Sequence, residues 1–88
     1  MRAVGGLRGT VLQTITGNGL NGCFGLAFDG ERVLVVNEPV ATVSLFKAAD
    51  FTPLGSLSVT SGASPRRVCS DGLNFWITRF NSNDIIRF

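Results

Sequence analysis

The chain has 88 residues, of which 44% are hydrophobic and 16% charged, and its formal net charge is +2. So small a basic excess, spread along the chain, is not the concentrated basic patch of a nucleic-acid-binding protein. No apolar run approaches the roughly 20 residues of a membrane-spanning helix, and residues 1–9 lack the apolar core of a secretory signal. We therefore expect a small globular unit with no nucleic-acid and no membrane partner, while the compartment stays unknown.

The predicted elements are short β-strands separated by turns. Glycine and β-branched residues are spread throughout, and no long run has the 3.6-residue spacing of a helix. Residues 1–10 form a lead-in, and an Asp-Gly pair, a strong tight-turn signal, follows the second and the sixth strand. In chain order the predicted strands are Val11–Thr16, Gly25–Phe28, Arg32–Val36, Thr42–Lys47, Leu54–Val59, Arg67–Ser70, Phe75–Thr78 and Asp84–Phe88.

The chain repeats in register around its two Asp-Gly pairs. Asp29-Gly30 and Asp71-Gly72 are 42 residues apart, and a shift by this distance places apolar positions on apolar positions, for example Leu34 on Trp76. A period in the low forties built from short strands is typical of β-propeller blades. The predicted fold is therefore all-β, with two blade equivalents of four antiparallel strands. The four strands of a blade are named A to D from the innermost outward. Along residues 11–88 the predicted strands follow in the order D, then A-B-C-D, then A-B-C.

Two blades cannot close a propeller ring on their own, because in a propeller both faces of each blade pack against neighbouring blades. Repeat units of this kind need about three or more neighbours to bury a core. The expected partners are therefore further blades. They come either from copies of the chain, three or four of which give six or eight blades within the usual range of about four to eight, or from the rest of a longer protein. A remnant without a selected function is a third interpretation.

The residues around the turns resemble the YVTN type of β-propeller repeat and, more loosely, the NHL repeats. In that family a loop proline leads into the inner strand, and the next strand ends in a Tyr-Val-Thr-Asn-like tetrad. Here Leu34–Asn37 and Trp76–Arg79 stand at the tetrad, and Pro65 stands at the loop proline. Cys23 replaces the other loop proline, and Arg79 replaces the tetrad's asparagine. The resemblance covers residues 11–88 and implies the propeller fold without implying one function.

Some relatives of this architecture are enzymes, namely streptogramin-cleaving lyases that depend on histidine and lactone hydrolases that hold a divalent metal. This chain has no histidine, so it lacks the general base of the first group. Turns account for Asp29, Asp71, Asp50 and Glu31. Of the other two carboxylates, Glu38 and Asp84, only Glu38 lies on a loop of the face that propellers use for ligands. We expect no catalytic residue, no metal and no cofactor. The alternative is a piece of a propeller hydrolase or lyase whose active residues lie outside this chain.

The two cysteines, Cys23 and Cys69, stand at non-equivalent places in the repeat. Cys69 falls within a predicted inner strand and is expected to be a small buried residue, whereas Cys23 lies at a loop end. Free thiols are the prediction, and a disulfide is the alternative.

The predicted binding surface is the rim made by the loops at one end of the strands. Its segment 79–83 places an aromatic ring beside amides and a guanidinium, which suits a sugar or a peptide, although an ordinary turn is the alternative. The adjacent basic pair 66–67 is either a solvated loop tip or a contact for a phosphate or an acidic partner. By its equivalence with Leu34, Trp76 is expected to pack between blades rather than to stack on carbohydrate. The predicted function is a non-catalytic binding or scaffolding module. Its candidate ligand-binding residues are Asn37, Glu38, Arg66, Arg67, Arg79, Phe80, Asn81 and Asn83.

Overall fold

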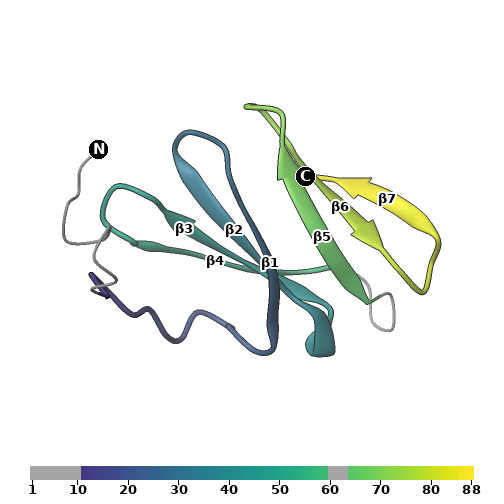
Figure 1. Ribbon diagram of the computed structural model, residues 1–88, viewed down its shortest axis with the longest axis horizontal. Helices are drawn as coiled ribbons and strands as arrows, with labels where there is room; N and C mark the ends of the chain where they lie inside the picture. Colours follow the sequence, from purple (N-terminus) through teal and green to yellow (C-terminus); the bar gives the residue numbers. More distant parts are fainter. Residues whose placement is uncertain (1–10, 60–63) are drawn as a thin grey trace.

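The computed structural model describes residues 11–59 and 64–88 (Figure 1). The described residues form seven β-strands and one short 3-10 turn, with no α-helix, so the all-β prediction is confirmed. None of the described residues belongs to a helix capable of crossing a membrane. The elements are β1 (Cys23–Phe28), β2 (Arg32–Asn37), η1 (Glu38–Val40), β3 (Thr42–Lys47), β4 (Pro53–Ser58), β5 (Pro65–Ser70), β6 (Phe75–Arg79) and β7 (Asp84–Arg87).

The strands form two antiparallel sheets, each a simple meander. Sheet A has the order β1-β2-β3-β4 and sheet B the order β5-β6-β7. Seven of the predicted strands are present, but β1 and β5 each begin two residues earlier than expected. The predicted strand Val11–Thr16 is not formed. A strand requires a hydrogen-bonding neighbour, and the open edge of β7 in sheet B, which lacks a fourth strand, is not paired with residues 11–16.

Corresponding features of the two sheets lie 42 residues apart. β1 and β5 each open with a bulge, one between Cys23 and Gly25 and the other between Pro65 and Arg67. The tight turns that follow are closed by equivalent hydrogen bonds, from the Asp29 N–H to the carbonyl of residue 32 and from the Asp71 N–H to that of residue 74, both 3.1 Å. The bulges and the tight turns of the two sheets thus stand at corresponding sequence positions. Left-handed backbone positions also correspond, namely Gly22 with Ser64, Gly30 with Gly72, and Ala41 with Asn83.

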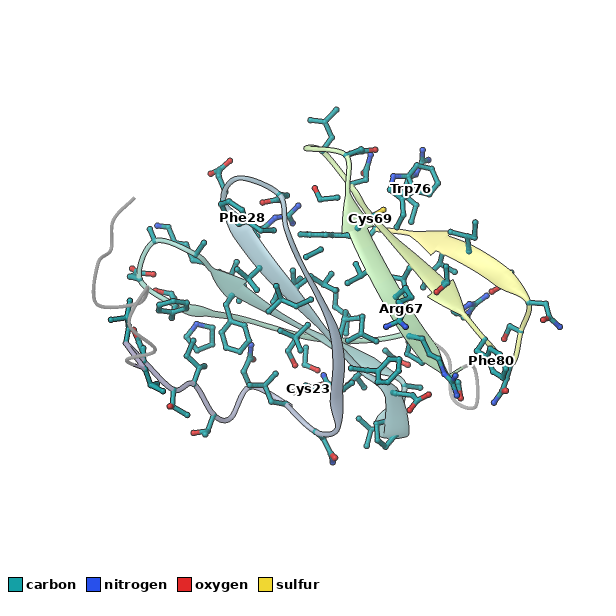
Figure 2. All side chains as sticks on the ribbon, viewed as in Figure 1. Cys23, Phe28, Arg67, Cys69, Trp76 and Phe80 are labelled. Carbon is teal, nitrogen blue, oxygen red and sulfur yellow. The ribbon has the colours of Figure 1, made fainter. Side chains whose placement is uncertain are left out.

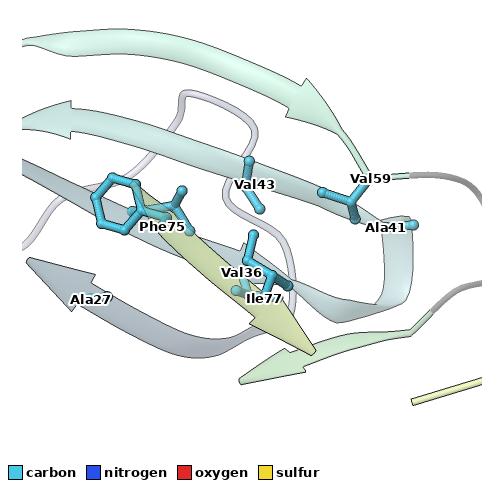
Figure 3. Close-up of a cluster of buried hydrophobic side chains, with 8 residues drawn as sticks. Ala27, Val36, Ala41, Val43, Val59, Phe75 and Ile77 are labelled. Atoms are coloured by element: carbon cyan, nitrogen blue, oxygen red, sulfur yellow. The ribbon is translucent and has the colours of Figure 1, made fainter. Parts of the chain in front are cut away.

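The hydrophobic core lies between the two sheets (Figure 3). From sheet B, Phe75 and Ile77 of β6 are almost completely buried, and the Arg32 guanidinium lies 5.2 Å from the centre of the Phe75 ring. Side chains alternate across a strand, so each sheet has one core face, turned to the other sheet, and one opposite face. On sheet A the segment before β1 lies on the opposite face, where Asn18 and Asn21 hydrogen-bond to Ser44 and Asn37. On sheet B the opposite face is called the free face. The core residues contributed by the first 59 residues are Ala27, Leu34, Val36, Ala41, Val43 and Val59.

Cys69 is exposed, so the expectation that it would be buried is wrong. Its neighbour Val68 packs against the core. The alternation of the strand therefore places Cys69 on the free face of sheet B, as Figure 2 illustrates.

The sheets approach most closely where β1 runs beside β5 (Figure 1). Gly25 stands at this point, and a Cβ atom on it would lie 2.7 Å from the carbonyl oxygen of Arg66 and 3.7 Å from Val68 Cγ1. Real Cβ atoms do not come so near a backbone oxygen. A glycine is needed here for space, and it allows the two core faces to meet.

Replacing Gly25 with alanine should therefore push β1 away from β5 and lower the free energy of unfolding by about 1–3 kcal/mol, as overpacking does elsewhere. Urea unfolding followed by circular dichroism measures the change. Cys69→Ala, on the free face of the adjacent strand, serves as the control and should stay within about 0.5 kcal/mol. Equal stabilities for Gly25→Ala and the parent chain would show that the close approach is not required.

Candidate functional site

Asn37, one of the predicted ligand-binding residues, is completely buried. Its amide nitrogen donates to Ser44 Oγ at 2.9 Å and Thr42 Oγ1 at 3.2 Å, and its Oδ1 accepts from the backbone N–H of Asn21 at 3.1 Å. Ser44 Oγ in turn donates to the Asn18 carbonyl at 2.8 Å. Asn37 therefore fastens the segment before β1 onto sheet A, and its side chain is not accessible to a ligand.

Residues of both sheets meet at the rim. Glu38, in the η1 turn after β2, accepts a hydrogen bond from Arg66 Nε of β5 at 2.7 Å. The Arg66 guanidinium also lies 4.3 Å from the centre of the Phe80 ring and 5.7 Å from that of Phe24, while Arg67 lies 5.2 Å from the Phe24 ring. Figure 2 shows Arg67 and Phe80 toward the same end of sheet B. The fold thus brings together four chain segments around two arginines and two phenylalanines.

Phe24 was missed by the sequence analysis. The predicted strand began at Gly25, which left Phe24 at the end of a loop without a stated role. The available signal was the 42-residue shift, because Phe24 is the equivalent of Arg66 in the basic pair.

The loop after β6 is held by its own ion pair. Arg79 Nε donates to Asp84 Oδ1 at 2.7 Å, and Arg79 Nη1 donates to the Val59 carbonyl at 3.2 Å. The hydrogen bonds between the two side chains raise the pKa of Arg79 and lower the pKa of the Asp84 carboxyl. Asn81 Nδ2 donates to Ser64 Oγ at 3.0 Å, and Asn83 adopts the left-handed backbone of the turn, with φ of 53°. Arg79 therefore stabilises this loop.

An open groove of about 430 Å³ runs along this part of the rim. Of the predicted residues, Arg66, Arg67, Arg79, Phe80 and Asn83 line it. Glu38 contributes indirectly, through its ion pair with Arg66, and Asn81 lies within the same loop as Phe80.

The arginines of the groove differ in how their charge is balanced. Arg66 is paired with Glu38 and Arg79 with Asp84, but within residues 11–59 and 64–88 no carboxylate forms an ion pair with Arg67. All six carboxylate side chains of the sequence fall in those ranges. Arg67 is exposed, so its charge is the one available to an incoming anionic group.

The other aspartates serve their turns, as predicted. Asp71 Oδ1 accepts from the backbone N–H groups of Asn74 at 2.7 Å and Leu73 at 2.9 Å, and its Oδ2 accepts from Trp76 Nε1 at 2.9 Å. These hydrogen bonds, of which that from Asn74 is the strongest, lower the pKa of Asp71 to about 2. Asp29 repeats the arrangement with the N–H groups of residues 31 and 32.

Cys23 and Cys69 are both free and exposed, in agreement with the prediction of free thiols. Within the described part of the chain, no three His, Cys, Asp or Glu side chains gather closely enough to hold a metal ion.

No protein-family model matches this sequence, and no curated protein matches it. Its function must therefore be argued from the fold and from the rim.

The turn carboxylates predict how stability depends on pH. Asp71 has a pKa of about 2 in the folded chain and an ordinary value of 3.8. A carboxyl whose pKa is lowered by folding adds stability that is fully present above its unfolded pKa and is lost as the pH falls through its folded pKa. The urea midpoint should therefore decrease between about pH 4 and pH 2.

Asp71→Asn retains an acceptor for the turn but removes the titrating group, so it should weaken this pH dependence without abolishing it, since Asp29, Asp50 and Asp84 also have lowered pKa values. An NMR titration of the Asp71 carboxyl with a midpoint near 3.8 would contradict the turn geometry.

Proposed function

We propose that the chain forms two adjacent blades of a β-propeller and acts as a non-catalytic binding or scaffolding module through its rim. In a propeller, sheets of consecutive antiparallel strands surround a central channel. The 42-residue correspondence between sheets A and B supports this arrangement, and so do the side-by-side positions of their first strands, β1 and β5. The resemblance to YVTN-type repeats points the same way.

The observation that carries the binding proposal is the pair of arginine–phenylalanine stacks at the rim. A guanidinium over an aromatic face is attractive and also holds the side chain in place. Arg66 and Arg67 are stacked in this way on Phe80 and Phe24. Arg67 lacks a carboxylate partner in the described residues, so it can donate charge-assisted hydrogen bonds to a ligand. A peptide or carbohydrate with an acidic group and a flat apolar side fits such a surface.

The rim carboxylates support binding rather than catalysis. A general base must be free to take a proton near the working pH. Glu38 and Asp84 are both engaged by arginines, and Arg79 keeps the pKa of Asp84 low.

The test is an NMR titration of the ¹⁵N-labelled chain with two probes, a tetraglutamate peptide and maltose. Chemical-shift changes should gather at the rim, and tetraglutamate should bind more tightly than maltose. Arg67→Gln should weaken tetraglutamate binding about tenfold or more, because a charge-assisted hydrogen bond contributes about 1.5–3 kcal/mol. Arg87→Gln is the matched control, since it removes the same charge from β7, outside the groove, and should leave the affinity nearly unchanged.

Equal losses of tetraglutamate affinity in Arg67→Gln and Arg87→Gln would indicate only a general effect of charge and would contradict the rim site. Shift changes confined to the Asp-Gly turns would contradict it as well.

A further inference from the structure

An apolar hollow of about 330 Å³ lies between sheet A and the segment that precedes β1, residues 11–22, which we call the leading segment. Its floor is the face of sheet A opposite the core, where the register pairs Leu26 with Val35 and Val33 with Phe46. The leading segment runs along sheet A in Figure 1 and is hydrogen-bonded to this face. The hollow is therefore a space enclosed by one chain, and a second sheet cannot lie flat on it.

The leading segment is fastened to sheet A beside the hollow. Ser44 Oγ of β3 donates to the Asn18 carbonyl at 2.8 Å. The next residue, Gly19, comes so near β4 that a Cβ atom on it would lie 2.9 Å from Ser56 Oγ. Leu20 follows directly, is half-buried and lines the hollow. This wall is therefore in place before a ligand arrives, so little ordering cost opposes binding.

A further wall is the ring of Phe51, in the turn between β3 and β4. Phe51 has a φ of 62°, a left-handed conformation that is an outlier for a bulky residue. A glycine would adopt the same conformation without strain, so the turn alone would favour glycine. Strained positions persist where their surroundings require them, and they gather at ligand sites. The ring that this turn carries thus belongs to the hollow.

The chemistry of the hollow selects an uncharged ligand. Apart from the Cys23 thiol, its lining consists of hydrocarbon side chains, and none of the described residues that line it is charged. The thiol itself is directed to Asn37 Oδ1, with Sγ 3.7 Å from that oxygen. A charged group would lose its hydration here without compensation, whereas an apolar ring is favoured. Phe46 and Phe51 both line the hollow and offer edge-to-face contacts to an aromatic ring.

We propose that the hollow binds a small uncharged molecule with an aromatic ring, which enters where Leu26 is 64% exposed and lies against Val35, Phe46 and Phe51. Ligand pockets in proteins have this size and this mostly apolar lining. The site is separate from the rim groove, since none of the described residues lines both. The proposal rests neither on the blade arrangement nor on rim binding.

The probe is indole, and the first measurement is an NMR titration of the ¹³C-labelled methyl groups of the chain. Shift changes should gather at Leu20, Val33 and Val35, with a dissociation constant of about 1 mM or lower. The methyl groups of Val43, in the core, and of Ile85, at the rim groove, should stay in place. Indole-3-acetate has the same ring and a carboxylate, so it should bind the hollow at least about tenfold more weakly.

The two cysteines provide an internal control. Both are free and exposed, but only Cys23 lines the hollow. Saturating indole should therefore slow the alkylation of Cys23 by iodoacetamide severalfold and leave Cys69 at its own rate, as measured by mass spectrometry of the two peptides. Equal slowing at both cysteines would overturn the inference.

Two variants separate binding from folding. Phe51→Gly suits the backbone of its turn and removes only the ring, so it should weaken indole binding by up to about tenfold while keeping the circular dichroism spectrum and tetraglutamate binding. Leu26→Ser alters an exposed position at the entrance and should weaken indole binding about threefold or more. Leu73→Ser is the matched control, because Leu73 is 82% exposed at the β5–β6 turn, and it should bind indole as the parent chain does.

Several outcomes would overturn the inference. Unchanged indole affinity in both Phe51→Gly and Leu26→Ser is one. A mass that rises with protein concentration while the Val33 and Val35 methyl groups stop responding to indole would show that a second copy covers the hollow. Nuclear Overhauser contacts from residues 1–10 to these methyl groups in the ligand-free chain would show that the chain fills the hollow itself.

The two proposals fail in different ways. A chain that binds tetraglutamate at the rim but never binds indole would overturn only this inference. A chain that binds indole in the hollow but never binds tetraglutamate would overturn only the proposed function of the rim.

Discussion

The close approach of β1 to β5 is the contact on which the rest of the molecule depends. Sheet B buries Phe75 and Ile77 against sheet A, and without that contact both side chains would be exposed to water. That burial requires the core faces to meet, which the missing side chain of Gly25 allows. The hydrophobic effect then stabilises both sheets together. A larger residue at this one position acts on the whole interface.

The same contact assembles the rim. Glu38 and Phe24 belong to sheet A and its connections, whereas Arg66 and Arg67 belong to β5. The Glu38–Arg66 ion pair and the contacts of both arginines with the Phe24 ring form only when the sheets are packed, whereas the Arg66–Phe80 contact lies within sheet B and its loop. Exposed ion pairs contribute little stability, so these contacts are positioned by the core and do not hold it together. The contribution of Glu38 and Phe24 to the rim is in this sense a consequence of sheet packing, whereas the groove itself is lined by residues of sheet B and its connecting loop.

Local chemistry was predictable from the sequence, and contacts between distant segments were not. The Asp29 and Asp71 turns were predicted because an aspartate side chain accepts hydrogen bonds from the backbone of its own turn, and the glycine that follows readily adopts a positive φ. The burial of Cys69 and the exposure of Asn37 were predicted wrongly, because a strand's register decides which side chain faces the core. Residues 11–16 have the pattern of a strand, but a strand also needs a neighbour that the pattern does not reveal. The partner of Arg66 could not be read from spacing, since 28 residues separate it from Glu38.

Native-state hydrogen exchange tests most directly whether the packing between sheets holds the molecule together. If it does, the protected amides of β5 and β6 should exchange with the same opening free energy as those of β2 and β3, and Gly25→Ala should lower all of them equally, because the two sheets then open as one cooperative unit. Faster exchange of sheet B, with sheet A unaffected by the substitution, would contradict this. Sheet B would then open independently of sheet A, and the parts of the rim on the two sheets would not form a single surface.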